Sequence, residues 1–437
     1  MRIRTIIVLV AVVFISASCA STSFSYPQAH IIPEDFFGIS PDRTDLEKDY
    51  MDIHTSLGAV WIRTTPRWTG VEKEEGVWDF SHWDEYVEKA EAAGKKIMFI
   101  LAFDNTWLYK DKKEHRNLGE KELPYFLKYV EQIVTRYKGR IHAYEIWNEP
   151  NGWFWYGSDK NFFALSAATA KKVKEIDPDT PVLAGALFRT EAGFLRGMYR
   201  AGAIDNVDGI SLHPYSANAL NTLKQVDKLR NIMAEFNDAK PVWISEVGYP
   251  TEGAWFSACD ADTYPQYIVK TLSGLAARDV RNVIWYELMD AYNPEDAPDH
   301  WNPSHFFGLI YPDKREKKGT EAYRLCSRFL AGAEYRPEYP QRDNVSKLIT
   351  SLYFKKGNEH VLILWYEFNG PENAPREKSV LLNIPGAASI VRHNIESGAA
   401  ETMEGETLIK IGVEPIFITW TGSNGVGPSI SETVSGR

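Results

Sequence analysis

The 437-residue sequence is poor in cysteine and lacks long runs of basic residues. Its three cysteines, Cys19, Cys259 and Cys326, are too few for a disulfide-bonded framework, and their spacing matches no metal site. The formal net charge is −10, which argues against nucleic acid as a partner. A Gly-x-Gly-x-x-Gly turn and any cluster of histidines with carboxylates are also absent, so we expect no cofactor and no metal ion.

The N-terminus carries the one long apolar run. Residues 6–15 are apolar, Arg2 and Arg4 precede them, and small residues fill 16–20. The run is too short to cross a bilayer, and its order is that of a cleaved export signal over residues 1–20. Cys19 stands where bacterial lipoproteins are lipidated, so a soluble exported protein and a lipid-anchored one are both open. We expect a periplasmic or extracellular location.

Aromatic residues are abundant, with 14 Trp, 22 Tyr and 21 Phe. A large aromatic core explains this count, and so do exposed rings that stack on sugars. Composition alone does not separate the two.

Between residues 34 and 332, short apolar runs alternate with longer amphipathic ones. Several of the apolar runs are continuous, as expected for strands buried on both faces. The predicted strands are 36–39, 59–63, 96–101, 143–147, 181–186, 209–212, 242–245 and 282–286. The predicted helices are 45–57, 81–93, 122–137, 160–176, 190–201, 220–236, 261–278 and 320–330. Eight strand–helix units predict an α/β fold, a (β/α)8 TIM barrel over residues 21–332. A doubly wound sheet usually has fewer strands and a glycine-rich first turn.

The composition changes after Ala331. Short strands separated by Gly, Asn and Pro turns predict a small C-terminal antiparallel β-sandwich over residues 333–421. The predicted strands are 347–354, 360–368, 379–384, 390–393, 407–411 and 415–420. Residues 422–437 are rich in Gly and Ser without periodicity, and predict a flexible tail.

Two glutamates end aromatic-rich strands. Glu149 follows 143–147, and Glu246 follows 242–245. Carboxylates at the C-terminal ends of barrel strands typically face the active site, and hydrolysis of a glycosidic bond uses such a pair. Glu149 lies among tryptophans that can raise its pKa, as an acid requires. An exposed loop glutamate is the alternative for Glu149.

A carboxylate that acts as a nucleophile needs a cation or hydrogen-bond donors beside it. Arg63, at the end of the second strand, and Tyr215, just past the sixth, are placed to supply them to Glu246. A surface salt bridge for Arg63 and a loop aromatic for Tyr215 are the alternatives.

The sequences Trp-Asn-Glu-Pro-Asn at 147–151 and Ser-Glu-Val-Gly-Tyr at 245–249 resemble the motifs of retaining glycoside hydrolases of clan A. Within that clan the chain is most similar to family 39 and related bacterial proteins that cut exopolysaccharides. The resemblance covers about residues 34–332. It implies double displacement through a covalent glycosyl-enzyme, with carboxyl groups about 5–5.5 Å apart.

The resemblance also implies residue roles. Glu149 matches the acid/base and Glu246 the nucleophile. The matching substrate-binding positions are Arg63, which supports the nucleophile, Asn148 at the sugar 2-hydroxyl, His213 and Tyr215 beside them, and Trp285 as the floor under the sugar.

Weaker candidates for sugar contacts are the loop tryptophans and one acid, namely Trp107, Trp153, Trp155, Trp255 and Glu287. Tryptophans that pack beneath loops, and a structural acid, are the alternatives. Glu145 lies four residues before Glu149 and, by the alternation of side chains along a strand, on the same side. We therefore expect it in a buried ion pair within the barrel.

These observations predict an exported, monomeric retaining β-glycosidase that acts on a polysaccharide or oligosaccharide. Long aromatic loops favour endo action on an exopolysaccharide. The alternatives are an exo-acting β-xylosidase-like enzyme, a transglycosylase, and a carbohydrate-binding barrel without activity.

Overall fold

The computed structural model describes residues 29–42, 44, 46–109, 117–367, 376–422 and 427–432. The predicted export signal and Cys19 lie outside the described residues. No helix in the described part of the chain is long and apolar enough to span a bilayer.

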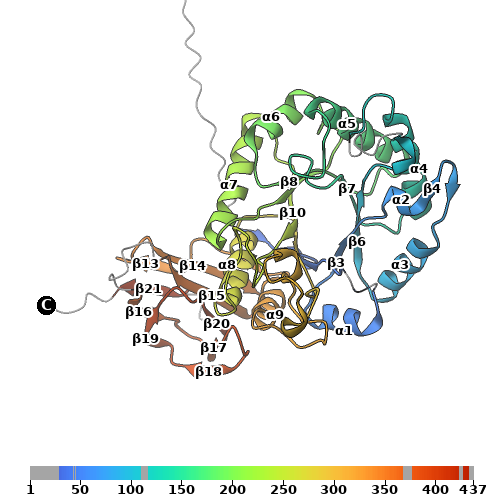
Figure 1. The fold of residues 1–437 in the computed structure, drawn as a ribbon. Helices are drawn as coiled ribbons and strands as arrows, with labels where there is room; N and C mark the ends of the chain where they lie inside the picture. The colour runs from blue at the N-terminus through green and yellow to red at the C-terminus, as the bar shows by residue number, and fades with distance from the viewer. Residues whose placement is uncertain are drawn as a thin grey trace, which may run out of the picture.

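Eight parallel strands close into a barrel, seen in the right half of Figure 1. They are β2 (Phe37–Ile39), β3 (Trp61–Thr64), β6 (Lys96–Leu101), β7 (Ala143–Ile146), β8 (Val182–Phe188), β9 (Gly209–His213), β10 (Val242–Val247) and β11 (Val283–Trp285). Each coincides with a predicted strand, so the (β/α)8 barrel is confirmed. Large side chains fill its interior, among them Trp61, Met98 and Trp243.

Helices surround the barrel as predicted. They are α1 (Lys48–Ser56), α3 (Ser81–Ala92), α4 (Leu123–Tyr137), α5 (Asp159–Ile176), α6 (Ala192–Arg200), α7 (Ala219–Glu235), α8 (Tyr264–Ala276) and α9 (Gly319–Leu330). On α4, Phe126, Val130, Ile133 and Tyr137 recur at helical spacing and are buried against the barrel. A short insertion after β3 adds α2 (Trp68–Val71), β4 (Glu72–Glu74) and β5 (Val77–Trp78), which the sequence pattern did not predict.

The C-terminal part forms two packed sheets, at the lower left of Figure 1. The larger sheet contains β1 (His30–Ile31), β12 (Glu334–Tyr335), β14 (Ile349–Lys356), β15 (Glu359–Tyr366), β20 (Ile416–Thr421), β17 (Ser389–His393) and β18 (Ala400–Met403). The smaller contains β13 (Gln341–Asp343), β21 (Ser429–Glu432), β16 (Lys378–Asn383) and β19 (Glu406–Ile411). Leu362, Leu364, Val380 and Leu382 pack in the core between them.

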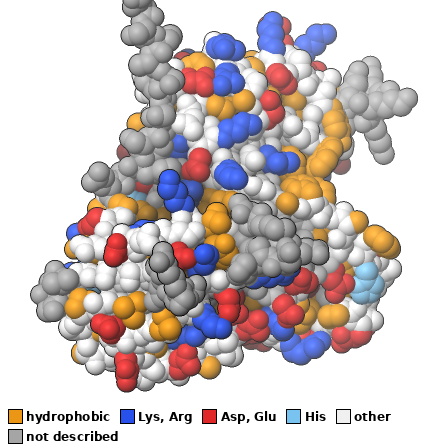
Figure 2. All heavy atoms as spheres, turned by 90° about the vertical axis from the view of Figure 1, so that its left-hand side faces the viewer, with side chains coloured by type: hydrophobic (Ala, Val, Ile, Leu, Met, Phe, Trp, Pro, Cys, Tyr) orange, Lys and Arg blue, Asp and Glu red, His pale blue; other side chains and the backbone are white. Residues whose placement is uncertain are grey.

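The larger sheet also packs on the barrel through its other face. Phe417 of β20 lies 5.7 Å from Phe329 of α9, measured between ring centroids. Lys270 of α8 lies over the ring of Trp365. The side of the molecule in Figure 2 carries charged side chains of both signs, and acidic ones are most frequent in its lower part.

Three sequence predictions for this region need correction. The tail 422–437 is not wholly flexible, because Ser429–Glu432 forms β21 and buries Ile430. One apolar residue among serines is too little pattern to indicate a strand. His30–Ile31, assigned to the barrel segment, pairs with β12 of the sandwich. The smaller sheet is not purely antiparallel, since β13 and β21 run parallel.

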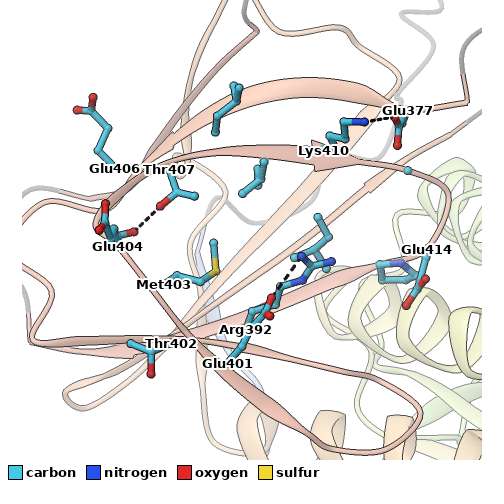
Figure 3. Close-up of a pocket in the computed structure, with 15 residues that line it drawn as sticks. Glu377, Arg392, Glu401, Thr402, Met403, Glu404, Glu406, Thr407, Lys410 and Glu414 are labelled. Atoms are coloured by element: carbon cyan, nitrogen blue, oxygen red, sulfur yellow. Dashed lines mark hydrogen bonds and ion pairs between the residues drawn. The ribbon is translucent and has the colours of Figure 1, made fainter.

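A hollow of about 860 Å³ opens on the sandwich (Figure 3). Charged side chains line it, but Lys410 pairs with Glu377 and Arg392 with Glu401 at its surface. Exposed pairs of this kind are ordinary surface features. The two glutamates predicted to be catalytic lie elsewhere, at the barrel mouth.

Candidate active site

A cavity of about 630 Å³ lies at the C-terminal ends of the barrel strands. Residues at or just after most of the barrel strands line it, including Ser40, Arg63, Phe103, Glu149, Phe188 and Glu246. Of the predicted site residues, Arg63, Asn148, Glu149, Trp153, Tyr215 and Glu246 line this cavity. His213 lies beneath them, fully buried.

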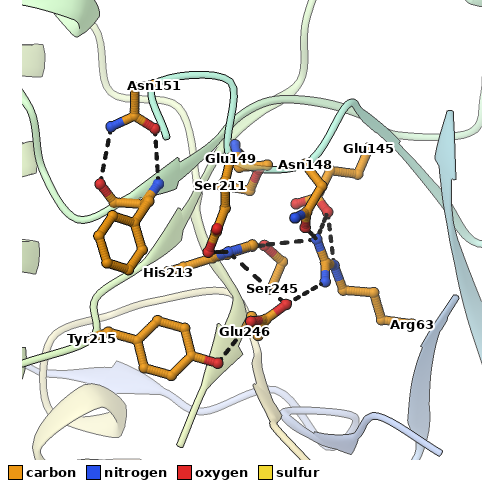
Figure 4. Close-up of polar contacts among 12 residues, drawn as sticks. Arg63, Glu145, Asn148, Glu149, Asn151, Ser211, His213, Tyr215, Ser245 and Glu246 are labelled. Carbon is orange, nitrogen blue, oxygen red and sulfur yellow. Dashed lines mark hydrogen bonds and ion pairs between the residues drawn. The ribbon is translucent and has the colours of Figure 1, made fainter. Parts of the chain in front are cut away.

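The two predicted carboxyl groups meet in this cavity (Figure 4). One oxygen of Glu149, one oxygen of Glu246 and one nitrogen of His213 all lie within 4.8 Å of one another. A separation this short fits a carboxyl pair that works through a covalent intermediate, because an inverting pair is spread wider to admit water.

Glu149 is held by an unusual backbone path after β7. Trp147 and Glu149 have φ values of 65° and 46°, in the left-handed region that non-glycine residues seldom occupy. The Glu149 amide donates to the carbonyl of Ala186 at 3.0 Å. The indole nitrogen of Trp147 donates to the carbonyl of Phe154 at 2.9 Å. These contacts fix the turn that carries the carboxyl group over the barrel mouth.

Burial raises the pKa of Glu149 to about 7. Its side chain is largely withdrawn from water, with the residue only 6% exposed, and the charge of Glu145 adds to the rise although Arg63 opposes it. A carboxyl group with this pKa can hold a proton near neutral pH and release it during a reaction.

His213 orients Glu149. Its Nδ1 lies 3.0 Å from Glu149 Oε1, and its Nε2 lies 3.3 Å from Arg63 Nη2 and 3.1 Å from Ser245 Oγ. Burial lowers the pKa of His213 to about 4, so the ring is neutral. A guanidinium can only donate, so Nε2 accepts and we assign the ring hydrogen to Nδ1. Nδ1 then donates to Oε1, which leaves Oε2 of Glu149 to carry the acidic proton.

Glu246 has a different environment. Arg63 Nη1 donates to its Oε2 at 2.8 Å, and the Tyr215 hydroxyl donates to its Oε1 at 2.7 Å. Burial raises the pKa of Tyr215 well above its usual range, so the phenol stays protonated and able to donate. Both contacts hold the carboxyl group of Glu246 in place at the cavity.

A register shift in β10 brings Glu246 to the cavity. Ile244 pairs with Val283 and Val247 with Trp285, so β10 advances by three residues against two of β11. Strict alternation from Trp243, which lies inside the barrel, would turn Glu246 outward. The bulge lets both Ser245 and Glu246 reach the site.

Arg63 connects the two sides of the site. Its Nε donates to Glu145 Oε2 at 2.7 Å, and its Nη2 to Asn148 Oδ1 at 2.7 Å. The Arg63–Glu145 pair is fully buried, so the prediction of a buried ion pair for Glu145 is confirmed and a surface role for Arg63 is wrong. Burial by itself would raise the pKa of Glu145, but Arg63 together with smaller contributions from other neighbouring residues outweighs it, and the pKa falls.

The tryptophans predicted to contact sugar separate into two groups. Trp153 lines the cavity and is 61% exposed, and Trp255 lies beside it with ring centroids 6.1 Å apart. Trp155 is instead buried against Trp147. Trp107 is partly buried and donates to the carbonyl of Glu72. Neither Trp107 nor Trp155 lines the cavity. The burial of Trp155 makes its predicted sugar contact wrong, whereas that of Trp107 stays a prediction.

The predictions for Trp285 and Glu287 are also wrong. Trp285 is fully buried and faces outward, its indole nitrogen 3.4 Å from the hydroxyl of Tyr264 on α8. Glu287 is fully buried and does not line the cavity. Ile284 lies inside the barrel, so alternation brings Tyr286 to the cavity in their place.

Sequence reasoning missed several other lining residues, including Ser40, Asp42, Arg67, Phe103 and Phe307. Ser40 and Phe103 come one or two residues after a predicted strand, which is the signal that could have found them. Arg67 and Phe307 lie in longer loops, where no such signal exists.

The group Glu149, His213 and Glu246 could by composition hold a metal ion. The donor set argues against it. Arg63 already places a positive charge 2.8 Å from Glu246, and the Nδ1 of His213 carries a hydrogen rather than a free lone pair.

The chain is similar to known proteins across the barrel and beyond. The family model of cellulase (glycosyl hydrolase family 5) matches residues 33–291. No curated protein matches the chain. Among solved structures, a family 39 glycoside hydrolase from Bacteroides cellulosilyticus WH2 aligns with a TM-score of 0.71 at 18% identity, covering 89% of this chain and 81% of that one.

A monomeric β-xylosidase from Caulobacter crescentus CB15 and a GH30 endoxylanase from Clostridium papyrosolvens C71 each align with a TM-score of 0.61 at 15% identity. Each alignment covers 91% of this chain and 98% of the other. The resemblance to clan A that the two glutamate motifs indicated is confirmed. Because the family model spans more than half of the sequence, the chain belongs to the cellulase family, glycosyl hydrolase family 5, and is a retaining glycoside hydrolase of clan A.

Proposed function

We propose that this protein is exported and cleaves internal β-glycosidic bonds of a polysaccharide, with Glu149 as acid/base and Glu246 as nucleophile. The observation that carries the assignment is the contrast between two carboxyl groups whose oxygens lie within 4.8 Å of each other. Burial raises the pKa of Glu149 to about 7, whereas Arg63 and Tyr215 donate hydrogen bonds to Glu246.

The reaction has two steps. Glu246 Oε attacks the anomeric carbon, and the bond to the leaving oxygen breaks as Glu149 gives that oxygen its proton. Glu149, now a carboxylate, takes a proton from water, whose oxygen attacks the anomeric carbon and releases Glu246. The second step restores both carboxyl groups to their starting states.

Asn148 and Tyr215 support this chemistry. Arg63 donates to Asn148 Oδ1, which fixes the amide orientation and leaves Nδ2 as the donor for a sugar 2-hydroxyl. Tyr215 donates to Glu246 Oε1 and Arg63 to Oε2, so the orientation of this carboxyl group is set before the substrate binds. Such preorganisation avoids reorganising the site during the reaction.

Endo action is supported by the exposed aromatic side of the cavity. Trp153 is 61% exposed, and Phe256, exposed at 41%, lies within 6.2 Å of Phe188 between ring centroids. Aromatic faces that continue past the carboxyl pair offer stacking surfaces to further sugars of a long chain.

Export is supported by the sequence of residues 1–20, and a lipid anchor through Cys19 is the membrane-bound form of the same proposal.

Two substitutions test the catalytic assignment. Glu246→Ala should abolish turnover, and added azide should restore part of it with inverted product. Glu149→Ala should slow substrates with poor leaving groups far more than activated aryl glycosides, because the latter need no proton. Glu145→Ala is an unsuitable control, because it removes the ion-pair partner of Arg63. Glu131→Ala, at an exposed position on α4, serves as the control instead. Wild-type activity in both active-site variants would refute the assignment.

An exo-acting β-xylosidase-like enzyme is the second candidate, because β-xylosidases are among the structures that share this fold. Chain-length analysis of the products separates the two. Endo action should lower the viscosity of a polymer solution early and yield oligosaccharides, whereas release of monosaccharide alone would establish exo action.

A further inference from the structure

The cavity has two chemically different halves. Thr64, Thr65 and Arg67 line it where β3 ends, and Ser40 and Asp42 where β2 ends. Aromatic rings line it across the barrel, where β7, β8 and β10 end, namely Trp153, Phe154, Phe188 and Trp255. In the barrel order β2 lies opposite β8, and the two halves adjoin where Phe103 stacks on Phe154 with ring centroids 5.5 Å apart.

Arg67 contributes a cation to the polar half. Its backbone is fixed, because its amide donates to the carbonyl of Thr65 at 2.8 Å and its own carbonyl accepts from Gly70 at 2.8 Å. Its guanidinium carbon lies 5.8 Å from the ring centroid of Phe103, another lining residue. Within the described residues, Arg67 forms no ion pair with a carboxylate.

The second arginine of the cavity differs in this respect. Arg63 is engaged by Glu145, Glu246 and Asn148. It has no capacity left for a substrate charge. Arg67 is exposed and forms no ion pair within the described residues, so the N–H donors of its guanidinium can reach a ligand.

A similar arginine stands near the aromatic half. The guanidinium carbon of Arg189 lies 5.3 Å from the ring centroid of Phe256, and the preceding residue, Phe188, lines the cavity. Arg189 likewise forms no ion pair among the described residues. A guanidinium beside an aromatic ring therefore lines the cavity at Arg67, and a second one, Arg189, follows the lining residue Phe188 without lining the cavity itself.

We propose that the polysaccharide bound here carries carboxylate groups on some of its sugars, as uronic acids do, and that Arg67 binds one of them. The inference rests on the proposed function and narrows its substrate class. A planar guanidinium matches a carboxylate through two parallel hydrogen bonds. The net charge of −10 repels a dense polyanion, which fits occasional rather than continuous carboxylation.

The test compares three polymers. The first is a β-linked polysaccharide with uronic acid residues, the second is the same polymer after its carboxyl groups are reduced to alcohols, and the third is a polymer without uronic acids that carries sulfate groups. Wild-type protein should show kcat/KM about tenfold or more higher on the carboxylated than on the reduced polymer. Arg67→Gln should bring this ratio close to one, and Arg67→Lys should restore it only in part because an ammonium lacks the fork.

Arg200→Gln is the matched control, since Arg200 is also exposed, forms no ion pair among the described residues and lies on α6 outside the cavity lining. Its ratio should equal that of wild type. A wild-type ratio near one, or an unchanged ratio in Arg67→Gln, would overturn the inference. A sulfated polymer that matches or exceeds the carboxylated one would overturn the uronic acid assignment.

Binding separates this inference from the proposed function. Affinity electrophoresis of Glu246→Ala, with and without Arg67→Gln, measures retention by the two polymers without turnover. Stronger retention by the carboxylated polymer that disappears with Arg67→Gln supports the inference even if no hydrolysis is found. Equal retention of both proteins would contradict it whatever the activity.

Discussion

His213 Nδ1 lies 3.0 Å from Glu149 Oε1, and the opposite nitrogen of the same neutral ring accepts from Arg63. The imidazole ring is therefore held by Arg63 on one side and positions the carboxyl group of Glu149 on the other. Arg63 itself bonds the other carboxyl group. One buried arginine consequently aligns both glutamates.

Replacing His213 tests this alignment. His213→Asn keeps an N–H donor near the Nδ1 position, whereas His213→Leu removes it and leaves Glu149 Oε1 without that donor. We expect His213→Leu to lower kcat on poor leaving groups by about tenfold or more and His213→Asn to lower it less. Steady-state kinetics with a series of aryl glycosides measures this. Equal losses in both variants, independent of leaving group, would show that the ring acts through packing alone.

The raised pKa of Glu149 predicts how activity depends on pH. The first step needs protonated Glu149, so kcat/KM on poor leaving groups should fall as pH rises through about 7. For substrates with good leaving groups, kcat/KM should fall less at alkaline pH, because their first step does not need the proton of Glu149. The measurement is a pH profile for both substrate types, and an alkaline limb near pH 5 or its absence would contradict the expected pKa.

The same pKa predicts a pH-dependent stability. The folded pKa of about 7 exceeds the ordinary value of 4.5, so wild type loses stability as pH rises from about 4.5 through 7. Glu149→Gln does not ionise. Its stability relative to wild type should therefore rise by up to about 3 kcal/mol between pH 4 and pH 8, at about 1.4 kcal/mol per pKa unit. Urea denaturation at both pH values measures this, and a constant difference would argue against the shift.

Trp153 and Trp155 should respond oppositely to truncation. Trp153→Ala removes an exposed ring from the cavity, so KM for a polymer should rise by about threefold to tenfold, from a stacking contribution of about 0.5–1.5 kcal/mol. Trp155→Ala opens a hole beside Trp147 and should cost about 3–5 kcal/mol of unfolding free energy. Thermal unfolding and polymer kinetics on both variants decide this. A large loss of stability in Trp153→Ala would place that ring in the core.

A buried ion pair anchors the loop that follows β11. Lys317 Nζ lies 2.8 Å from Asp290 Oδ2 and donates to the carbonyl of Phe306 at 3.0 Å, next to the lining residue Phe307. Lys317→Met leaves Asp290 buried without its cation and should cost about 3–5 kcal/mol. Lys314→Met breaks the exposed pair with Asp49 and the contact of the ammonium with the ring of Tyr50, and should cost less, about 1 kcal/mol. Similar losses in both variants would show that burial of the pair is unimportant.

Several features were predictable because they depend on local pattern. The barrel strands are short continuous apolar runs, and such runs result from burial on both faces whatever the neighbours are. Glu145 was placed inside the barrel by alternation with Glu149, four residues later, and the structure confirms a buried ion pair, with Arg63 as the partner. In β11 the resemblance placed Trp285 at the site and alternation from it placed Glu287 there, but Ile284 points inward and the cavity receives Tyr286 instead.

Other features had no local signal. Ser429–Glu432 is a strand only because β13 and β16 lie on either side of it. Trp153 and Trp155 are two residues apart in one loop, yet one faces the cavity and the other packs on Trp147. A loop has no fixed period, so the exposure of its side chains depends on what packs beneath it.

Glu149 and Glu246 could be identified from their strands alone, since the C-terminal ends of barrel strands meet at one mouth whatever the loops do. Their different chemistry could not. It depends on His213, Arg63 and Tyr215, which come from other strands and reach the two carboxyl groups only in the closed barrel. Burial and hydrogen bonding set a pKa, and both are properties of residues distant in sequence that the fold brings together.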